Sequence, residues 1–372
     1  MQPYPTDQNN QTPPEHYPNH RFIPNGAPVQ GFPTYSPQQY TFVPGIGFVR
    51  RSPQDDERAQ LRTAGTRLAA AMLFCLALMY LVYPVASLLS SRIVMLFHGW
   101  VSTAASGLLS TNITYLAAVL IPFGVYRARV GIPMRAAFAL RRPRPWLVVC
   151  GTLIFLAVTV IASFSSEVLD TVLGWVGLYA RQNNAVMPSD AFGIVLYVLL
   201  YIVLSSVVEE LVFRGLVLQS LRCFGDGLAL VCSSAMFALI HTDLLILPYA
   251  FLSGLVLGYF VLRSGSVVTG IVIHSVNNLF WVVYDVASKR LVPEWSGIVR
   301  EGISIVFILC GLVALIVAAR RDKDLFTLAP ARAVLPFKAR LQTLMGSGAM
   351  ILLYIAASVI MASSLSTTYI PW

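Results

Sequence analysis

The chain has 372 residues, of which 56% are hydrophobic and only 12% are charged, against roughly 25% charged in an average soluble domain. The formal net charge is +9, but the basic residues lie in short segments between long apolar runs. This distribution excludes an ordinary soluble domain and argues against a nucleic-acid partner. We therefore expect a polytopic membrane protein of the all-α class.

The first segment of the chain, residues 1–65, is expected to lie outside the membrane body. Up to about residue 49 it is rich in Pro, Gln, Asn and Tyr and has no hydrophobic periodicity. Such a stretch buries too little apolar surface to offset the entropy that is lost on ordering. We predict a disordered cytoplasmic tail over 1–65 and a transmembrane helical bundle over 66–366.

Long apolar runs fill this body, each comparable to the about 20 residues that a membrane-spanning helix needs. In chain order they are Leu68–Ser90, Gly107–Tyr126, Trp146–Phe164, Ala191–Leu221, Leu228–His241 continuing into Leu244–Leu262, Val267–Tyr284, Gly302–Ala319 and Ser347–Ser363. Only a few residues separate the fifth run from its continuation, so the two count as one span or two. The sequence predicts a polytopic bundle of eight or nine spans.

The short segments between the runs differ in charge. Residues 127–145 hold six arginines and no acid, and residues 320–340 hold six basic residues against two acids, whereas residues 165–190 hold three acids and one arginine. Basic short loops mark the cytoplasmic side of a membrane. We therefore predict a cytoplasmic N-terminus, with anionic lipid headgroups of the bilayer facing the arginines. The charge pattern and the lack of organelle targeting suit a bacterial plasma membrane.

Three polar clusters interrupt the apolar runs between residues 191 and 284. They are Glu209-Glu210-Leu-Val-Phe-Arg214, Phe237-Ala-Leu-Ile-His241 and His274-Ser-Val-Asn-Asn278. Each contains a pair at i, i+4 spacing, so the two members share one helix face. At 1.5 Å per residue from the expected cytoplasmic turns, Glu209 lies about 20 Å, His241 about 21 Å and His274 about 16 Å inside the membrane. Three helices therefore bring polar groups to a similar depth.

The glutamate pair in the first cluster divides into two roles. A charge at membrane depth is costly unless it has a partner or a function. Glu210 supplies a counter-ion for Arg214 one turn later, so we expect these two residues to support the site. Glu209 projects about 100° away around the helix, and Arg214 does not obviously satisfy it. Glu209 is therefore a candidate general base.

The two other clusters supply groups that suit acyl transfer. His241 could share a water molecule with Glu209. His274 and Asn278 offer two side-chain donors toward one point, as an oxyanion requires. We therefore expect Glu209, His241, His274 and Asn278 to form a catalytic site that hydrolyses a peptide bond.

The order Glu-Glu-x-x-x-Arg, Phe-x-x-x-His and His-x-x-x-Asn on successive membrane helices resembles the CAAX-protease and bacteriocin-processing family, also called CPBP or Abi. The resemblance covers about residues 190–285 and implies an intramembrane endopeptidase, a hydrolase acting on a peptide or membrane-protein substrate. It places the family's catalytic glutamate on Glu209, its histidines on His241 and His274, and its asparagine on Asn278. Glu210 and Arg214 take supporting positions.

The cofactor is left open by the sequence. Members of this family are commonly called metalloproteases, and a Zn²⁺ site would use His241, His274 and Glu209, a donor set typical of catalytic zinc. In a metal-free reaction, Glu209 and His241 activate water. The chain has no HExxH motif, and we favour the metal-free reaction.

Two other functions are compatible with the same motifs. A non-catalytic membrane scaffold or bacteriocin-immunity-type protein would keep the fold without turnover. A proton-coupled transporter could use Glu and His side chains as a proton relay, but such transporters are marked by repeats with broken helices, and no repeat is visible. We therefore rank the transporter last.

Overall fold

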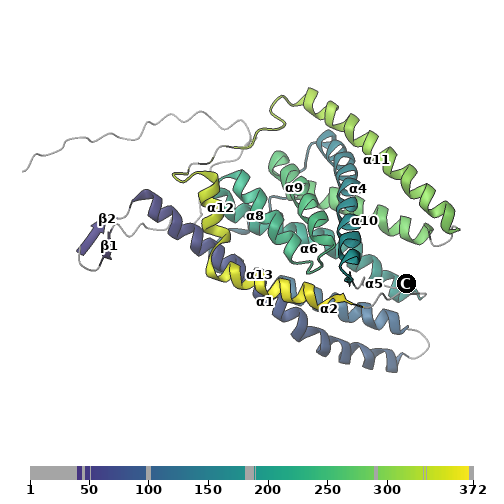
Figure 1. The fold of residues 1–372 in the computed structure, drawn as a ribbon. Helices are drawn as coiled ribbons and strands as arrows, with labels where there is room; N and C mark the ends of the chain where they lie inside the picture. Colours follow the sequence, from purple (N-terminus) through teal and green to yellow (C-terminus); the bar gives the residue numbers. More distant parts are fainter. Residues whose placement is uncertain are drawn as a thin grey trace, which may run out of the picture.

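The structure is a computed structural model that describes residues 40–43, 47–50, 52–97, 102–180, 188, 190–288, 292–329, 331 and 333–367. These residues are mostly helical (Figure 1). The all-α class predicted from the apolar runs is confirmed. The expectation of disorder for residues 1–39 lies outside the described residues.

The elements outside the motif region are long helices, short connecting helices and two small antiparallel sheets. The helices are α1 (Pro53–Leu96), α2 (Thr103–Val130), α3 (Met134–Ala137), α4 (Pro145–Trp175), α11 (Pro293–Arg321), α12 (Phe337–Met345) and α13 (Gly348–Ser363). The strands are β1 (Tyr40–Val43) with β2 (Gly47–Arg50), and β3 (Tyr179–Ala180) with β4 (Leu365–Ser366). The second sheet connects the chain after α4 to the chain after α13.

Helix α1 begins inside the segment that was expected to be tail. Its N-cap is Ser52, whose hydroxyl accepts a hydrogen bond from the Asp55 backbone N–H, and Pro53 occupies the first turn. Ser at the N-cap, Pro at the first position and acids in the first turn are all helix-starting signals. The helix therefore starts at these signals, before the apolar run at Leu68.

The number of candidate spans in the described residues is seven, or eight if the bent pair α12 and α13, at an angle of 66°, is one span. Eight is the lower of the two numbers predicted. The difference comes from the run at 228–241, which forms the fourteen-residue helix α8 (Asp226–Leu239). A run of this length is more typical of a buried core helix or re-entrant segment than of a full span.

The fourth span, Ala191–Phe224, changes its winding several times. It consists of α5 (Ala191–Val198), η1 (Leu199–Leu204), α6 (Ser205–Glu209), η2 (Glu210–Val217), α7 (Leu218–Leu221) and the 3₁₀ turn η3 (Arg222–Phe224). The segments η1 and η2 are π-helical, and the N–H groups of Ser205 and Leu218 bond to carbonyls five residues earlier. Wide turns of this kind occur frequently at functional sites.

The fourth span lies in the interior of the bundle with α8, α9 (Ile246–Ser264) and α10 (Val267–Ser288), between α11 on one side and α1, α2 and α13 on the other (Figure 1). Helices α8 and α9 approach closely. A Cβ atom at Gly254 would lie 2.9 Å from Ser234 Cβ, and one at Gly258 would lie 2.6 Å from Leu230 Cδ1. The small-residue pattern of this helix therefore provides the close contact that it predicted.

Candidate active site

A buried ion pair lies at the centre of the fourth span. The side chains of Glu210 and Arg214 are both 0% exposed, and Arg214 Nη1 lies 2.8 Å from Glu210 Oε1. The ion pair that the i, i+4 spacing predicted is therefore present. Arg214 Nη2 also donates a hydrogen bond to the carbonyl oxygen of Gly254 at 3.4 Å. The guanidinium thus connects the fourth span to α9.

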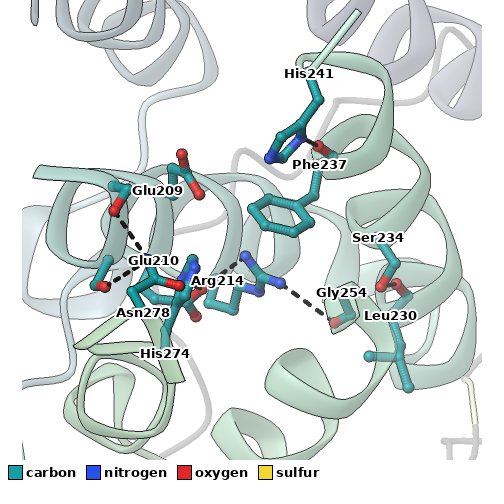
Figure 2. Close-up of polar contacts among 12 residues, drawn as sticks. Glu209, Glu210, Arg214, Leu230, Ser234, Phe237, His241, Gly254, His274 and Asn278 are labelled. Carbon is teal, nitrogen blue, oxygen red and sulfur yellow. Dashed lines mark hydrogen bonds and ion pairs between the residues drawn. The ribbon is translucent and has the colours of Figure 1, made fainter. Parts of the chain in front are cut away.

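The ring of Phe237, in α8, connects this charged centre to both histidines. The guanidinium carbon of Arg214 lies 4.2 Å from the ring centroid, a cation–π contact. The rings of His241 and His274 meet Phe237 edge-on, with centroid separations of 5.0 Å and 6.1 Å (Figure 2). The three clusters predicted to lie at a similar depth therefore converge on one aromatic ring.

His241 follows the C-terminal end of α8. Its Nδ1 atom lies 2.8 Å from the carbonyl oxygen of Phe237, and because a carbonyl only accepts, Nδ1 carries the hydrogen. In the neutral ring, Nε2 is then the atom with a free lone pair. The next residue, Thr242, has a φ of 50°, a left-handed conformation that is unusual for a β-branched residue. This turn takes the chain away from α8 directly after the histidine.

His274 lies on α10 and faces the ion pair. Its Nδ1 atom is 3.2 Å from Glu210 Oε1, the same oxygen that Arg214 contacts. Because a carboxylate only accepts, Nδ1 donates and the Nε2 atom points to the opposite side of the ring. Glu210 therefore orients His274 in addition to neutralising Arg214, a second role that the helical spacing did not predict.

Gly270, one turn before His274, makes room for this contact. A Cβ atom at Gly270 would lie 2.4 Å from Glu210 Oε2, a separation that would force one of the two helices to move. Oε2 is buried and has no hydrogen-bond partner among the described residues. The carboxylate therefore packs directly against the backbone of α10, which only glycine permits here.

Asn278 is held by two serines of α6. Its Nδ2 atom donates to Ser205 Oγ at 3.0 Å and to Ser206 Oγ at 3.3 Å (Figure 2). Asn277, to which the sequence gave no role, donates from Nδ2 to Asn278 Oδ1 at 3.2 Å and accepts from Thr159 at 3.2 Å. Both hydrogens of the Asn278 amide are thus engaged, so an oxyanion would have to replace one serine hydroxyl as acceptor.

Glu209 has a partner that the sequence did not suggest. The residue is 8% exposed, and its Oε1 atom accepts a hydrogen bond of 2.9 Å from the Tyr115 hydroxyl on α2. Figure 2 shows the Glu209 carboxylate and the His241 ring turned toward the same space beside Arg214. A water molecule between them would meet the carboxylate from one side and the imidazole from the other.

Comparison with known proteins identifies the segment that holds this arrangement. Residues 191–280 match a family model described as "Type II CAAX prenyl endopeptidase Rce1-like". Through this segment, the chain is Rce1-like. The match agrees with the family that the three motifs predicted, and it spans the fourth span, α8, α9 and most of α10. No curated protein and no solved structure matches the chain.

The donor atoms of the Rce1-like segment do not form a metal cluster in the described parts of the chain. No group of three or more His, Cys, Asp or Glu side chains there is arranged to hold a metal ion. Two predicted ligands already use a ring nitrogen elsewhere, because His241 Nδ1 bonds to Phe237 and His274 Nδ1 bonds to Glu210. We therefore derive no step through a metal ion.

Sequence reasoning missed four contributors to the Rce1-like site. Tyr115 lies outside the motif region, and nothing in its surroundings marks it. Phe237 was visible as the first residue of Phe-x-x-x-His, but its contact with Arg214 depends on how α8 packs against the fourth span. The Ser205-Ser206 pair, directly upstream of Glu209 in a greasy helix, was a usable signal, and Gly270 one turn before His274 was a weaker one.

Proposed function

We propose that the chain is an intramembrane endopeptidase that hydrolyses a peptide bond of a peptide or membrane-protein substrate. Support comes from the Rce1-like match over residues 191–280 and from the candidate membrane-spanning helices around it. The observation that carries the proposal is the pairing of Glu209 and His241 across one space, each with its other contact already satisfied by Tyr115 or Phe237.

In the proposed reaction, Glu209 acts as general base and His241 orients the water. The water donates one hydrogen to the Glu209 carboxylate and one to the lone pair of His241 Nε2, and its oxygen attacks the carbonyl carbon of the scissile bond. The proton taken by Glu209 passes to the amide nitrogen when the C–N bond breaks. The products are a new carboxyl end and a free amine.

The oxyanion of the tetrahedral intermediate needs hydrogen-bond donors aimed at the position where its charge develops. We assign this role to His274 and Asn278. Glu210 fixes the His274 ring through Nδ1, so a hydrogen on Nε2 would face away from the ion pair. Asn278 would exchange its bond to Ser205 or Ser206 for one to the oxyanion.

Comparing membrane proteomes with and without the candidate base tests the function. We expect a Glu209→Gln variant and a His241→Ala variant to accumulate an uncleaved precursor that the wild-type chain removes. Glu167→Gln is the matched control, because Glu167 is a 51% exposed carboxylate of α4 that pairs only at the surface with Arg300. If both site variants process all proteins as the wild type does, a scaffold without turnover is the correct function.

The cofactor is tested on the purified protein. We propose a metal-free reaction, so cleavage of the trapped precursor should continue after treatment with a zinc chelator and dialysis. Loss of cleavage that returns on adding Zn²⁺ would instead support the ligand set of His241, His274 and Glu209. Elemental analysis of the same sample reports bound metal independently of activity.

We also propose that the protein lies in a bacterial plasma membrane with its N-terminus in the cytoplasm. The six arginines and no acids in residues 127–145 support this orientation. A tag fused before residue 1 should resist protease added outside intact cells. Digestion of the tag in intact cells would reverse the orientation.

A further inference from the structure

The hydrogen bond from Tyr115 to Glu209 joins the candidate base to a helix that the Rce1-like match does not cover. Tyr115 lies on α2, whereas the match begins at residue 191. The donor–acceptor distance is 2.9 Å, and Glu209 is 8% exposed. A hydrogen bond to a charged group is shorter and stronger than one between neutral groups, so this contact fixes one oxygen of the carboxylate.

The ring that carries this hydroxyl is itself held in place. Tyr115 packs against two apolar clusters, the main core and a smaller cluster formed by Leu108, Leu196, Tyr197 and Leu200. The smaller cluster joins α2 to the start of the fourth span. A phenol ring wedged between two packed clusters has little freedom to move its hydroxyl, so the position of Glu209 Oε1 depends on the packing of α2.

The same ring lines a cavity of about 410 Å³ between α1 and α2. The other lining residues are mostly apolar or aromatic and include Leu76, Met79, Tyr80 and Tyr83, together with Thr242, the neighbour of His241. Tyr115 is therefore the member of this lining that contacts Glu209. Tyr80 and Tyr83 share the cavity and are 62% and 46% exposed.

We propose that Tyr115 is a positioning residue that holds the Glu209 carboxylate toward His241 through its hydroxyl. With Oε1 bound to Tyr115, Oε2 is the oxygen that receives the proton of the attacking water. Small errors in the position of a catalytic group are costly, because a displacement of about 1 Å can lower a rate roughly 100-fold. The proposal rests on the proposed function, since it assigns Tyr115 a role in the same hydrolysis.

The first measurement tests the hydrogen bond without any substrate. The infrared carboxyl band that disappears in Glu209→Gln is assigned to Glu209. In purified Tyr115→Phe, which keeps the ring and its packing, this band should shift, whereas Tyr80→Phe and Tyr83→Phe should leave it in place. An unshifted band in Tyr115→Phe overturns the proposal.

The second measurement tests the consequence for catalysis, on the precursor that accumulates in the Glu209→Gln membranes. Tyr115→Phe should lower kcat about 10-fold to 100-fold, the range expected for losing a hydrogen bond to a charged group, with KM changed less than about twofold. The melting temperature should stay that of the wild type. A shifted band with unchanged kcat overturns the positioning role.

The two proposals fail in different ways. If Glu209→Gln still cleaves every protein, the proposed function is wrong whatever Tyr115→Phe does. If Glu209→Gln stops cleavage while Tyr115→Phe behaves as the wild type in both measurements, only the role of Tyr115 is wrong.

Discussion

The fourth span and α11 are both long apolar helices, yet their side chains meet opposite surroundings. The fourth span buries Glu209, Glu210 and Arg214 among neighbouring helices, and its winding is interrupted by two π-helical segments. Helix α11 is α-helical throughout and exposes large apolar side chains such as Leu309 and Val313, which are 57% and 61% exposed. Apolar length therefore marks both as membrane helices, while the partners of their polar groups mark only one as a site.

The ion pairs of the two regions sharpen this contrast. The Glu210–Arg214 pair is fully buried, whereas the Glu167–Arg300 pair between α4 and α11 is about half exposed on both sides. A buried pair that loses one partner leaves an uncompensated charge, but an exposed pair is screened by solvent. The same chemistry therefore has different consequences in the two places.

Breaking the buried pair should have the largest effect. We expect Glu210→Gln to destabilise the protein by about 3–5 kcal/mol, because Arg214 keeps its charge without a counter-ion. Glu167→Gln should cost about 1 kcal/mol or less. Thermal unfolding in detergent measures both, and equal losses from the two variants would show that burial does not govern these pairs.

Removing the shared aromatic ring should have the next largest effect. Phe237→Leu loses the contact with Arg214 and both edge-on contacts with the histidines, so we expect about 2–4 kcal/mol of destabilisation. Phe307→Leu in α11, which loses one ring contact with Phe280, should cost about 1 kcal/mol beyond the lost area. A chemical denaturation series on the two variants compares them, and a smaller loss for Phe237→Leu would contradict the prediction.

Adding a methyl group separates the two regions further. Gly270→Ala places a Cβ atom 2.4 Å from Glu210 Oε2, so we expect about 1–3 kcal/mol of destabilisation. Gly302→Ala in α11 meets nothing within 4 Å and should stabilise the helix by up to about 1 kcal/mol. Melting temperatures that shift in the same direction for both variants would show that the α10 contact is not restrictive.

The smallest effect concerns the start of the fourth span. The Ser102 hydroxyl, followed by the Gly193 backbone N–H, lowers the pKa of Asp190 below its ordinary value of 3.8. A depressed carboxyl pKa adds stability above the unfolded value, and this stability is lost as pH falls through the folded pKa. Asp190→Asn keeps a capping side chain and should melt slightly below the wild type at pH 7, with the difference vanishing below about pH 3. A difference that persists in acid would contradict this cause.

The sequence predicted the parts of the site that depend on one helix at a time. The spacing of Glu210 and Arg214 predicted their ion pair, and counting residues inward predicted that Glu209, His241 and His274 share a depth. These predictions need only the rise and the turn of a helix. The apolar runs predicted the all-α bundle in the same way.

The remaining features depend on contacts between helices that are distant in sequence. Tyr115 meets Glu209 across 94 residues, and no spacing rule relates the two positions. The two π-helical segments were also unpredictable, because the composition of the fourth span is that of an ordinary apolar helix. The engagement of Asn278 by Ser205 and Ser206 follows from the same rotation of α6 against α10.

The wide turns of η1 and η2 make the fourth span sensitive to a change of a single residue. Each π-helical segment accommodates backbone bonds that reach five residues back, where a regular helix would use four. Deleting one residue within η1 would let the span return to regular winding, and everything before the deletion would turn by about 100° relative to Glu209. Helix α5, which packs against α2, would then present a different face to Tyr115. Insertions and deletions are therefore more disruptive in this helix than most substitutions.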